Sequence, residues 1–221
     1  MSLGLRLAKA VEDVIATSGF RYVRKQNAFL RTAAHGFDQI LWTSHPTQFA
    51  GRSGQQYSLV SGVRHEVVEE LVNQLGLVYG TESQRVTTTV SCALFYFPIN
   101  PGRSYSLFLP DKAAEPELHA GAMEISDTLV TDVFPFFKRY SSLVECAQGL
   151  GSDRMARAHH LCNNYEARMY RAIASSCLSG ESSVAEQLEL WRASYSEILP
   201  ETIHAKVAAR LRTLAGLLGG S

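Results

Sequence analysis

Several signatures of common protein classes are missing from this chain. It has no P-loop or Rossmann glycine pattern and no GxSxG nucleophile elbow, so nucleotide binding and serine hydrolysis have no motif here. It has no run of about 18 apolar residues, so we expect no membrane span. No CxxC pair occurs, and the spacing of its cysteines fits no zinc template. We therefore expect no metal and no cofactor. The cysteines are Cys92, Cys146, Cys162 and Cys177.

An excess of one charge is also missing. The 221 residues carry 21 Lys and Arg against 21 Asp and Glu, so the chain as a whole lacks the basic footprint of a nucleic-acid-binding protein. The charge is nevertheless uneven. Residues 1–31 carry six basic and two acidic side chains, whereas residues 110–147 carry three basic and seven acidic ones. These segments either form complementary faces or are two separately solvated surfaces.

The start of the chain is not typical of a secreted protein. Charged residues occur from Arg6 onward, before any apolar run of the length that a signal peptide needs. We therefore expect a cytoplasmic location, where thiols stay reduced. Cys162 and Cys177 lie on apolar helical stripes, which favours buried hydrophobic packing over disulfides or reactive thiolates.

Hydrophobic residues make up 46% of the chain. Their spacing changes along the chain between that of a helix and that of a strand, which predicts an α+β fold. Aromatic and β-branched runs between residues 20 and 63 predict an antiparallel meander with a loop at 50–56. Two further strands are expected over residues 86–97 and 105–109. Helical spacing predicts helices over residues 3–18, 65–75, 116–137, 152–176, 184–198 and 203–218.

Glycine and proline mark the expected ends of these elements. Gly19 suits the left-handed position after the first helix, and Pro135 should kink or end the helix over residues 116–137. The Gly149-Leu150-Gly151 segment is the clearest boundary. We expect a small antiparallel sheet with helices on one face in a domain of residues 1–148. A C-terminal helical region of residues 149–221 should follow and dock on that domain.

The first half of the chain resembles an uncharacterised bacterial family known only as a domain of unknown function (DUF4304-like). The resemblance covers roughly residues 5–110. It implies a helix, a basic stretch and a meander, and it supplies no catalytic residues. Small proteins of this kind are often immunity or accessory proteins. The segments that carry it are Gly19-Phe20, Arg24-Lys25, Phe29-Leu30-Arg31, Ile40-Leu41-Trp42 and Ser61-Gly62-Val63.

Two histidine-containing segments are candidates for chemistry. His65-Glu66-Val67-Val68-Glu69 resembles a zincin helix, but Glu69 stands where the second histidine is needed, so we expect a solvated helix face. His159 and His160 are adjacent, and on a helix their side chains point about 100° apart. We therefore expect them to be surface or packing histidines that do not share a metal.

The best surface candidate is the basic stretch near the start of the meander. Its residues are interleaved with Tyr22 and Phe29. These side chains can meet an acidic protein partner or grip nucleic-acid phosphates. In a third interpretation the aromatics pack in the core and the charges are simply solvated. The predicted partner-binding residues are Arg21, Arg24, Lys25 and Arg31.

Together these features predict a non-enzymatic cytoplasmic binding protein, an immunity or accessory protein with a protein partner. Nucleic acid and membrane are not expected as partners, and the oligomeric state does not follow from the sequence. The alternative is a small enzyme or ligand-binding domain with a pocket between the sheet and the C-terminal helices. An enzyme should bring two or three of these residues together in a cleft: His65, Glu69, Glu66, Arg64, His35 and Arg31.

Overall fold

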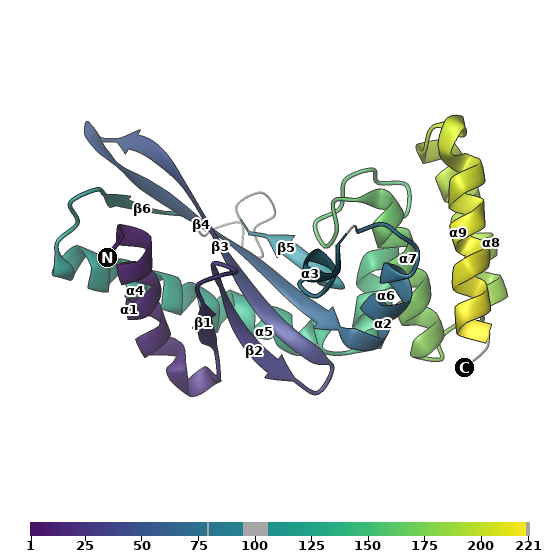
Figure 1. Cartoon of the computed structure of the whole chain (residues 1–221), viewed down its shortest axis with the longest axis horizontal. Helices are drawn as coiled ribbons and strands as arrows, with labels where there is room; N and C mark the ends of the chain where they lie inside the picture. Colours follow the sequence, from purple (N-terminus) through teal and green to yellow (C-terminus); the bar gives the residue numbers. More distant parts are fainter. Residues whose placement is uncertain (79, 95–105, 220–221) are drawn as a thin grey trace. The chain divides into compact units, whose positions relative to one another are not determined.

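The computed structural model describes residues 1–78, 80–94 and 106–219, and within them the strands form one antiparallel sheet (Figure 1). The strand order is β1-β2-β3-β4-β5, and β6 pairs with β4. Helices follow the sheet to the end of the described chain, so the α+β class predicted from the sequence is confirmed. The strands are β1 (Arg21–Val23), β2 (Ala28–Ala33), β3 (Gly36–Phe49), β4 (Arg52–His65), β5 (Val90–Ala93) and β6 (Ser106–Pro110).

The chain divides into two compact units, each made of two chain segments. Unit 1 comprises Met1–Gly62 and Cys92–Lys138, and unit 2 comprises Val63–Ser91 and Arg139–Ser221. The boundary expected after residue 148 falls inside a helix, α6 (Leu143–Gly151), which belongs to unit 2.

Unit 1 begins with α1 (Leu3–Ile15), which forms because apolar residues recur at helical spacing. Its buried residues are Leu7, Ala8, Val11 and Ile15, whereas Val14 is exposed. A short 3-10 turn, η1 (Ala16–Ser18), follows, and Gly19 ends it with a φ of 80°. This is the left-handed conformation predicted for Gly19.

The β3–β4 hairpin is longer than the sequence predicts, and Figure 1 shows it extending beyond β1 and β2. The loop expected at residues 50–56 is wrong, because only Ala50 and Gly51 turn, with φ values of 50° and 76°. The residues after the turn pair with β6. A Cβ on Gly54 would collide with the carbonyl oxygen of Leu109, so the small residue lets β6 approach.

A nearly continuous helical segment covers one face of the sheet in unit 1. It consists of α4 (Glu115–Thr128), a π turn η2 (Leu129–Val133) and α5 (Phe134–Tyr140), and α4 packs on α1 and β6 (Figure 1). Of the two outcomes expected at Pro135, a kink or an end, the helix does not end there, but its winding changes. The wider π turn lies directly before it, with the Phe134 N–H donating to the Leu129 carbonyl. This turn accommodates a residue that has no N–H to donate.

Unit 2 is helical and is organised around α7 (Tyr165–Leu178), which contacts α2, α6, α8 and α9. Met169, Tyr170, Ile173 and Trp191 are completely buried there. The helices predicted over residues 65–75, 184–198 and 203–218 are confirmed. The remaining helices of this unit are α2 (Glu66–Asn73), the short α3 (Thr81–Gln84), α8 (Val184–Ile198) and α9 (Glu201–Gly219).

Two predicted elements are wrong in their extent. The strand expected over residues 86–97 is reduced to β5, residues 86–89 are not strand, and residues 95–97 lie outside the described part of the chain. Tyr105, expected in the last strand, also lies outside it. The helix expected from residue 152 begins only at Tyr165, after the side chain of Asn164 accepts the N–H of Ala167 at 2.9 Å.

A buried arginine explains why residues 152–164 are not helical. Arg168 is completely buried, and its Nη2 donates to the carbonyl oxygens of Asp153, Arg154 and Ala156 at 3.5, 3.3 and 2.8 Å. In a helix these carbonyls would accept backbone N–H groups instead. The need to solvate a buried guanidinium therefore overrides the helical spacing of the apolar residues.

Candidate functional site

A row of aromatic side chains crosses unit 1 on one face of the sheet. Tyr22 on β1 lies opposite Phe29 on β2, with ring centroids 5.2 Å apart. The row continues from Phe29 to Trp42 on β3 at 6.0 Å and from Trp42 to Tyr57 on β4 at 5.2 Å. Alternation along each strand sends these side chains to the same face. The row therefore joins four strands and ends at Tyr57.

The first turn of α1 lies beside the end of this row. Ser2 caps the helix, and its side-chain oxygen accepts the N–H of Leu5 at 3.4 Å. The N–H groups of Leu3 and Gly4 come earlier and have no acceptor within the helix. A Cβ on Gly4 would lie 3.5 Å from the hydroxyl oxygen of Tyr57. The first turn of α1 therefore lies against the ring and hydroxyl of Tyr57.

These groups border an open pocket of about 500 Å³, which we name the α1 pocket. Its volume is in the range of pockets that hold small ligands or a partner's side chain. Its walls come from α1, the turn after β1, and strands β3 and β4. It is lined by Ser2, Leu3, Gly4, Leu5, Tyr22, Arg24, Asn27, Trp42, Ser44, Gln55, Tyr57 and Asp111.

The wall between β1 and β3 is held by side-chain hydrogen bonds. The Tyr22 hydroxyl donates to Asn27 Oδ1 at 2.6 Å, and Asn27 Nδ2 donates to the Trp42 carbonyl at 2.6 Å. Asn27 has a φ of 49°, a conformation that asparagine adopts more readily than most residues. Burial raises the pKa of Tyr22. This wall is therefore satisfied internally and shapes the pocket.

Two aromatic donors in the pocket have no internal partner. Trp42 is only 3% exposed, yet its indole N–H has no hydrogen-bond acceptor in the described structure. Tyr57 is also 3% exposed, and no acceptor for its hydroxyl is found among the described residues. Buried polar groups in folded proteins are rarely left unpaired. The Trp42 Nε1 atom is itself inaccessible to water, so of these two donors only the Tyr57 hydroxyl can meet a ligand in the pocket.

Opposite charges lie at the pocket lining. Arg24 and Asp111 are both exposed, and neither makes an ion pair with another described residue. Burial, with a smaller contribution from the charge of Asp111, raises the pKa of Tyr57 to about 12. Near neutral pH the Tyr57 hydroxyl is therefore protonated and acts as a hydrogen-bond donor.

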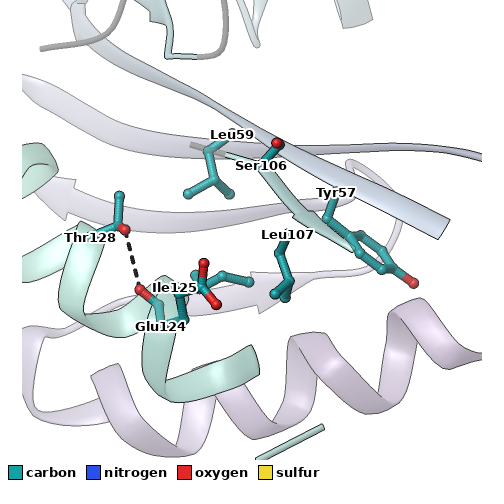
Figure 2. Close-up of a pocket in the computed structure, with 7 residues that line it drawn as sticks. All are labelled: Tyr57, Leu59, Ser106, Leu107, Glu124, Ile125 and Thr128. Atoms are coloured by element: carbon teal, nitrogen blue, oxygen red, sulfur yellow. Dashed lines mark hydrogen bonds between the residues drawn. The ribbon is translucent and has the colours of Figure 1, made fainter. Parts of the chain in front are cut away.

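A second, much smaller cavity lies on the other side of Tyr57. Figure 2 shows Leu59, Leu107 and Ile125 gathered around it, while the hydroxyl of Tyr57 points away from them. Its volume is about 20 Å³. That is room for about one water molecule, so this cavity is a packing gap in the core of unit 1.

The four residues predicted to bind a partner are placed differently from one another. Arg21, Arg24 and Lys25 are exposed, and Arg24 lines the α1 pocket. Arg31 instead donates to Asp38 Oδ2 from Nε at 3.0 Å and from Nη2 at 2.6 Å. Its guanidinium also lies 4.7 Å from the ring centroid of Phe20. Arg31 is therefore largely engaged in holding unit 1 together.

The helix that resembles a zincin motif is not the solvated face that we expected. His65 is 3% exposed, and its Nε2 lies 2.8 Å from the Tyr140 carbonyl oxygen. Glu69 is completely buried and accepts from Arg171 Nε at 2.8 Å and from Nη2 at 2.9 Å. Burial alone would raise the pKa of Glu69, but Arg171 outweighs it and holds that pKa below its usual value. The prediction of a solvated face is wrong, because Arg171 on α7 pairs with Glu69 inside the protein and neutralises its charge.

The six residues that an enzyme should bring together fall into separate clusters. Arg64 donates to Glu66 and to the Thr87 carbonyl in unit 2. In unit 1, His35 Nε2 lies 3.1 Å from Asp38 Oδ1, beside Arg31. None of the six lines the α1 pocket.

His159 and His160 do not lie on a helix, and their ring centroids are 4.4 Å apart. His159 Nδ1 accepts the N–H of Leu161 at 3.2 Å, so a neutral His159 carries its proton on Nε2. That Nε2 lies 3.1 Å from Ser152 Oγ, which donates to the Gly149 carbonyl. His159 therefore has no free lone pair to activate Ser152 as a nucleophile.

The four cysteines are all free thiols, and Cys92, Cys146 and Cys162 are buried. Burial raises the pKa of Cys92 to about 11. Burial and, to a smaller extent, the charge of Glu145 raise that of Cys146 to about 12. Neither thiol is a reactive thiolate near neutral pH.

Unit 2 has an open depression of about 380 Å³, lined by residues that include Gln148, Ser152, Arg154 and Glu181. Its polar side chains are partly paired with one another, since Gln148 Nε2 donates to Glu181 at 3.0 Å. No buried, unpaired donor is found among its lining residues. The α1 pocket is therefore the stronger candidate.

Sequence reasoning found Arg24 but missed Trp42, Tyr57 and Asp111 as pocket residues. The alternation of aromatics on β1 to β4 was a usable signal, because it places them on one face. The unpaired state of the Trp42 indole had no signal in the sequence.

Comparisons with protein-family models, curated proteins and solved structures gave no match. Among the described residues, no group of three or more His, Cys, Asp or Glu side chains is placed to hold a metal ion. Within the same part of the chain, no helix combines the length and apolar character needed to cross a bilayer.

Proposed function

We propose that this chain is a non-enzymatic binding protein and that the α1 pocket receives a group from a protein partner. The observation that carries the proposal is the Tyr57 hydroxyl, a donor with no internal partner that lies beside Gly4 in the lining of a 500 Å³ pocket. Arg24 is exposed and lines the pocket, and its neighbours in the chain, Arg21 and Lys25, are also exposed.

The chemistry of the pocket supports binding over catalysis. Proton transfer near neutral pH needs a group whose pKa lies close to that pH. The pKa of Tyr57 is about 12, and that of Tyr22 is also raised by burial. The guanidinium of Arg24 offers hydrogen-bond donors and no acceptor. These groups are suited to hold a ligand by hydrogen bonds and charge.

The test is a nuclear magnetic resonance titration of the full chain with fragments that stand for parts of a partner. The fragments are the N-acetyl amides of Glu, Gln, Lys and Phe, together with N-acetylglycine for a chain end. We expect at least one fragment to shift the resonances of Gly4 and of the Trp42 indole saturably. The indole of Trp191, in unit 2, should not move.

A matched pair of glycine substitutions makes the test specific. Gly4→Leu places a side chain against Tyr57 and into the pocket, whereas Gly216→Leu on α9 points into open space. Gly4→Leu should abolish the shifts and Gly216→Leu should keep them, with the Trp191 resonance reporting that both variants fold. Absence of any shift, or shifts that persist in Gly4→Leu, would overturn the proposal.

A further inference from the structure

We propose that residues 152–164 form an acid-sensitive latch of unit 2, which opens when His159 takes up a proton while the surrounding helices stay folded. This device is separate from the α1 pocket, and it does not depend on the proposed function. The segment contains no helix or strand, and it joins the end of α6 to the start of α7.

The segment is attached to the rest of unit 2 through hydrogen bonds at separate points. Three of its carbonyl groups accept from Nη2 of the buried Arg168. The carbonyl oxygen of Leu161 accepts the N–H of Ser91 at 2.8 Å. Arg157 Nη2 donates to the carbonyl oxygen of Ile198 at 3.2 Å. Contacts of this kind can open together without unfolding the neighbouring helices.

His159 fits this segment only as a neutral ring. It is 5% exposed, and its Nδ1 accepts the N–H of Leu161 at 3.2 Å. Its Nε2 lies 3.1 Å from Ser152 Oγ, which donates its own proton to the Gly149 carbonyl, so Nε2 carries the hydrogen. A second proton has to bind Nδ1, where it points at the N–H donor of Leu161. Protonation therefore breaks a hydrogen bond inside the segment.

The charges around His159 also oppose its protonation. The buried guanidinium of Arg168 on α7 is solvated by backbone carbonyls and forms no ion pair with a described residue. The ring of His160 lies 4.4 Å from that of His159, and Arg139 lowers the pKa of His160. Asp153 acts in the opposite direction and has the smallest effect. Burial first, then His160 and Arg168, lower the pKa of His159 to about 4.

An open segment removes these penalties. Once His159 reaches water, its pKa returns to about 6.5. The open form therefore takes up the proton that the closed form excludes, and its population rises as the pH falls from about 6.5 to 4. We expect the open fraction to increase at least about tenfold between pH 7 and pH 5.

The experiment is amide hydrogen exchange of the full chain, followed by nuclear magnetic resonance at about pH 7 and about pH 5. Rates are expressed as protection factors, which remove the intrinsic effect of pH on exchange. The reporters are the N–H groups of Ser91 and Leu161, which bond to the closed segment. Both should lose protection at least about tenfold at the lower pH. The amides of α8 and α9 should lose much less.

A matched pair of histidine variants makes the test specific. His159→Gln removes the titrating group, so protection at Ser91 should no longer depend on pH. His119→Gln, at an exposed position on α4, should keep the full pH dependence. The ring resonances of His159 in the unmodified chain give a second measurement, because they report whether the closed form is protonated.

Equal protection of Ser91 and Leu161 at both pH values would overturn the proposal. Equal losses in α8 and α9 would also overturn it, since they would mean that the whole unit unfolds. A pH dependence that persists in His159→Gln would assign the trigger to another group. If that variant is already open at about pH 7, the unmodified chain decides. Ring protonation that coincides with lost protection supports the latch, and ring protonation in a closed segment refutes it.

Discussion

The two units use buried polar groups in different ways. In unit 2 charged side chains join distant helices, since Glu69 pairs with Arg171 and Glu166 pairs with Arg210, and all four are mostly buried. In unit 1 the strands are joined instead by the row of aromatic side chains from Tyr22 to Tyr57. Buried polar atoms without a partner occur in both units, for example Trp42 Nε1 in unit 1 and Arg168 Nε in unit 2. The two units therefore differ in what joins their elements, which is ion pairs between helices in unit 2 and contacts between aromatic rings in unit 1.

The largest effect should come from breaking the buried pair in unit 2. Glu69→Gln leaves the buried Arg171 without its counter-charge, and we expect the free energy of unfolding to fall by about 3–5 kcal/mol. Urea unfolding followed by the fluorescence of Trp191, in a Trp42→Phe background, measures it. Glu189→Gln, an exposed position on α8, is the control. Equal stability of the two variants would remove the contrast between the units.

Two buried tyrosines sharpen the comparison directly. The Tyr170 hydroxyl donates to Glu166 Oε1 at 2.8 Å, so Tyr170→Phe should lower stability by about 1.5–3 kcal/mol. Tyr57→Phe removes a hydroxyl without an internal partner and should change stability by less than about 0.5 kcal/mol. Thermal and urea unfolding of both variants check this. A large loss in Tyr57→Phe would mean that its hydroxyl is already satisfied.

Unit 2 should also respond to acid through His159. Burial, followed by the charges of His160 and Arg168, lowers the pKa of His159 to about 4, whereas the unfolded chain has a value of about 6.5. The unfolded state therefore binds the proton first as the pH falls. The free energy of unfolding should therefore fall by roughly 1–2 kcal/mol as the pH is lowered from about 6.5 to 4, and it should be highest above pH ~6.5.

The measurement is the free energy of unfolding at several pH values in that window. His159→Gln should flatten the pH dependence, while His119→Gln, at an exposed position on α4, should leave it unchanged. An unchanged slope in His159→Gln would contradict the assignment.

The smallest effect concerns the β3–β4 turn of unit 1. Ala50 has a φ of 50°, a conformation that alanine adopts at a cost of about 1 kcal/mol. Ala50→Asn should therefore stabilise the chain by about 0.5–1 kcal/mol, because asparagine tolerates this conformation. Ala34→Asn, in the neighbouring β2–β3 turn with an ordinary φ, should bring no gain. A gain at Ala34 alone would point to a cause other than backbone strain.

Local patterns predicted much of this fold, because helical spacing and turn residues act over a few positions. The helices after residue 183 and the turn at Gly19 follow from such patterns. Contacts between residues far apart in the chain do not follow from such local patterns. Glu69 meets Arg171 across 102 positions, and no spacing near Glu69 reveals that partner. Arg168 likewise recruits carbonyls from a segment whose apolar spacing predicts a helix.

The pocket was harder to predict than the fold for the same reason. Arg24 was found because it belongs to a local basic stretch. Trp42, Tyr57 and Asp111 come from three separate segments and meet only when the sheet and α1 assemble. The basic stretch also predicted Arg31 as a binding residue, but its ion pair with Asp38 depends on the β2–β3 register.

The discontinuous make-up of the units has a consequence for biosynthesis. Residues 63–91 leave the ribosome long before residues 139–221, with which they form unit 2. At a synthesis rate of about 5–20 residues per second, Glu69 waits roughly 5–20 s for Arg171. During that interval α2 carries an apolar stripe and a carboxylate that have not yet met their helical partners. The nascent chain is therefore most vulnerable to aggregation and proteolysis around residues 63–91, the segment of unit 2 that is made first.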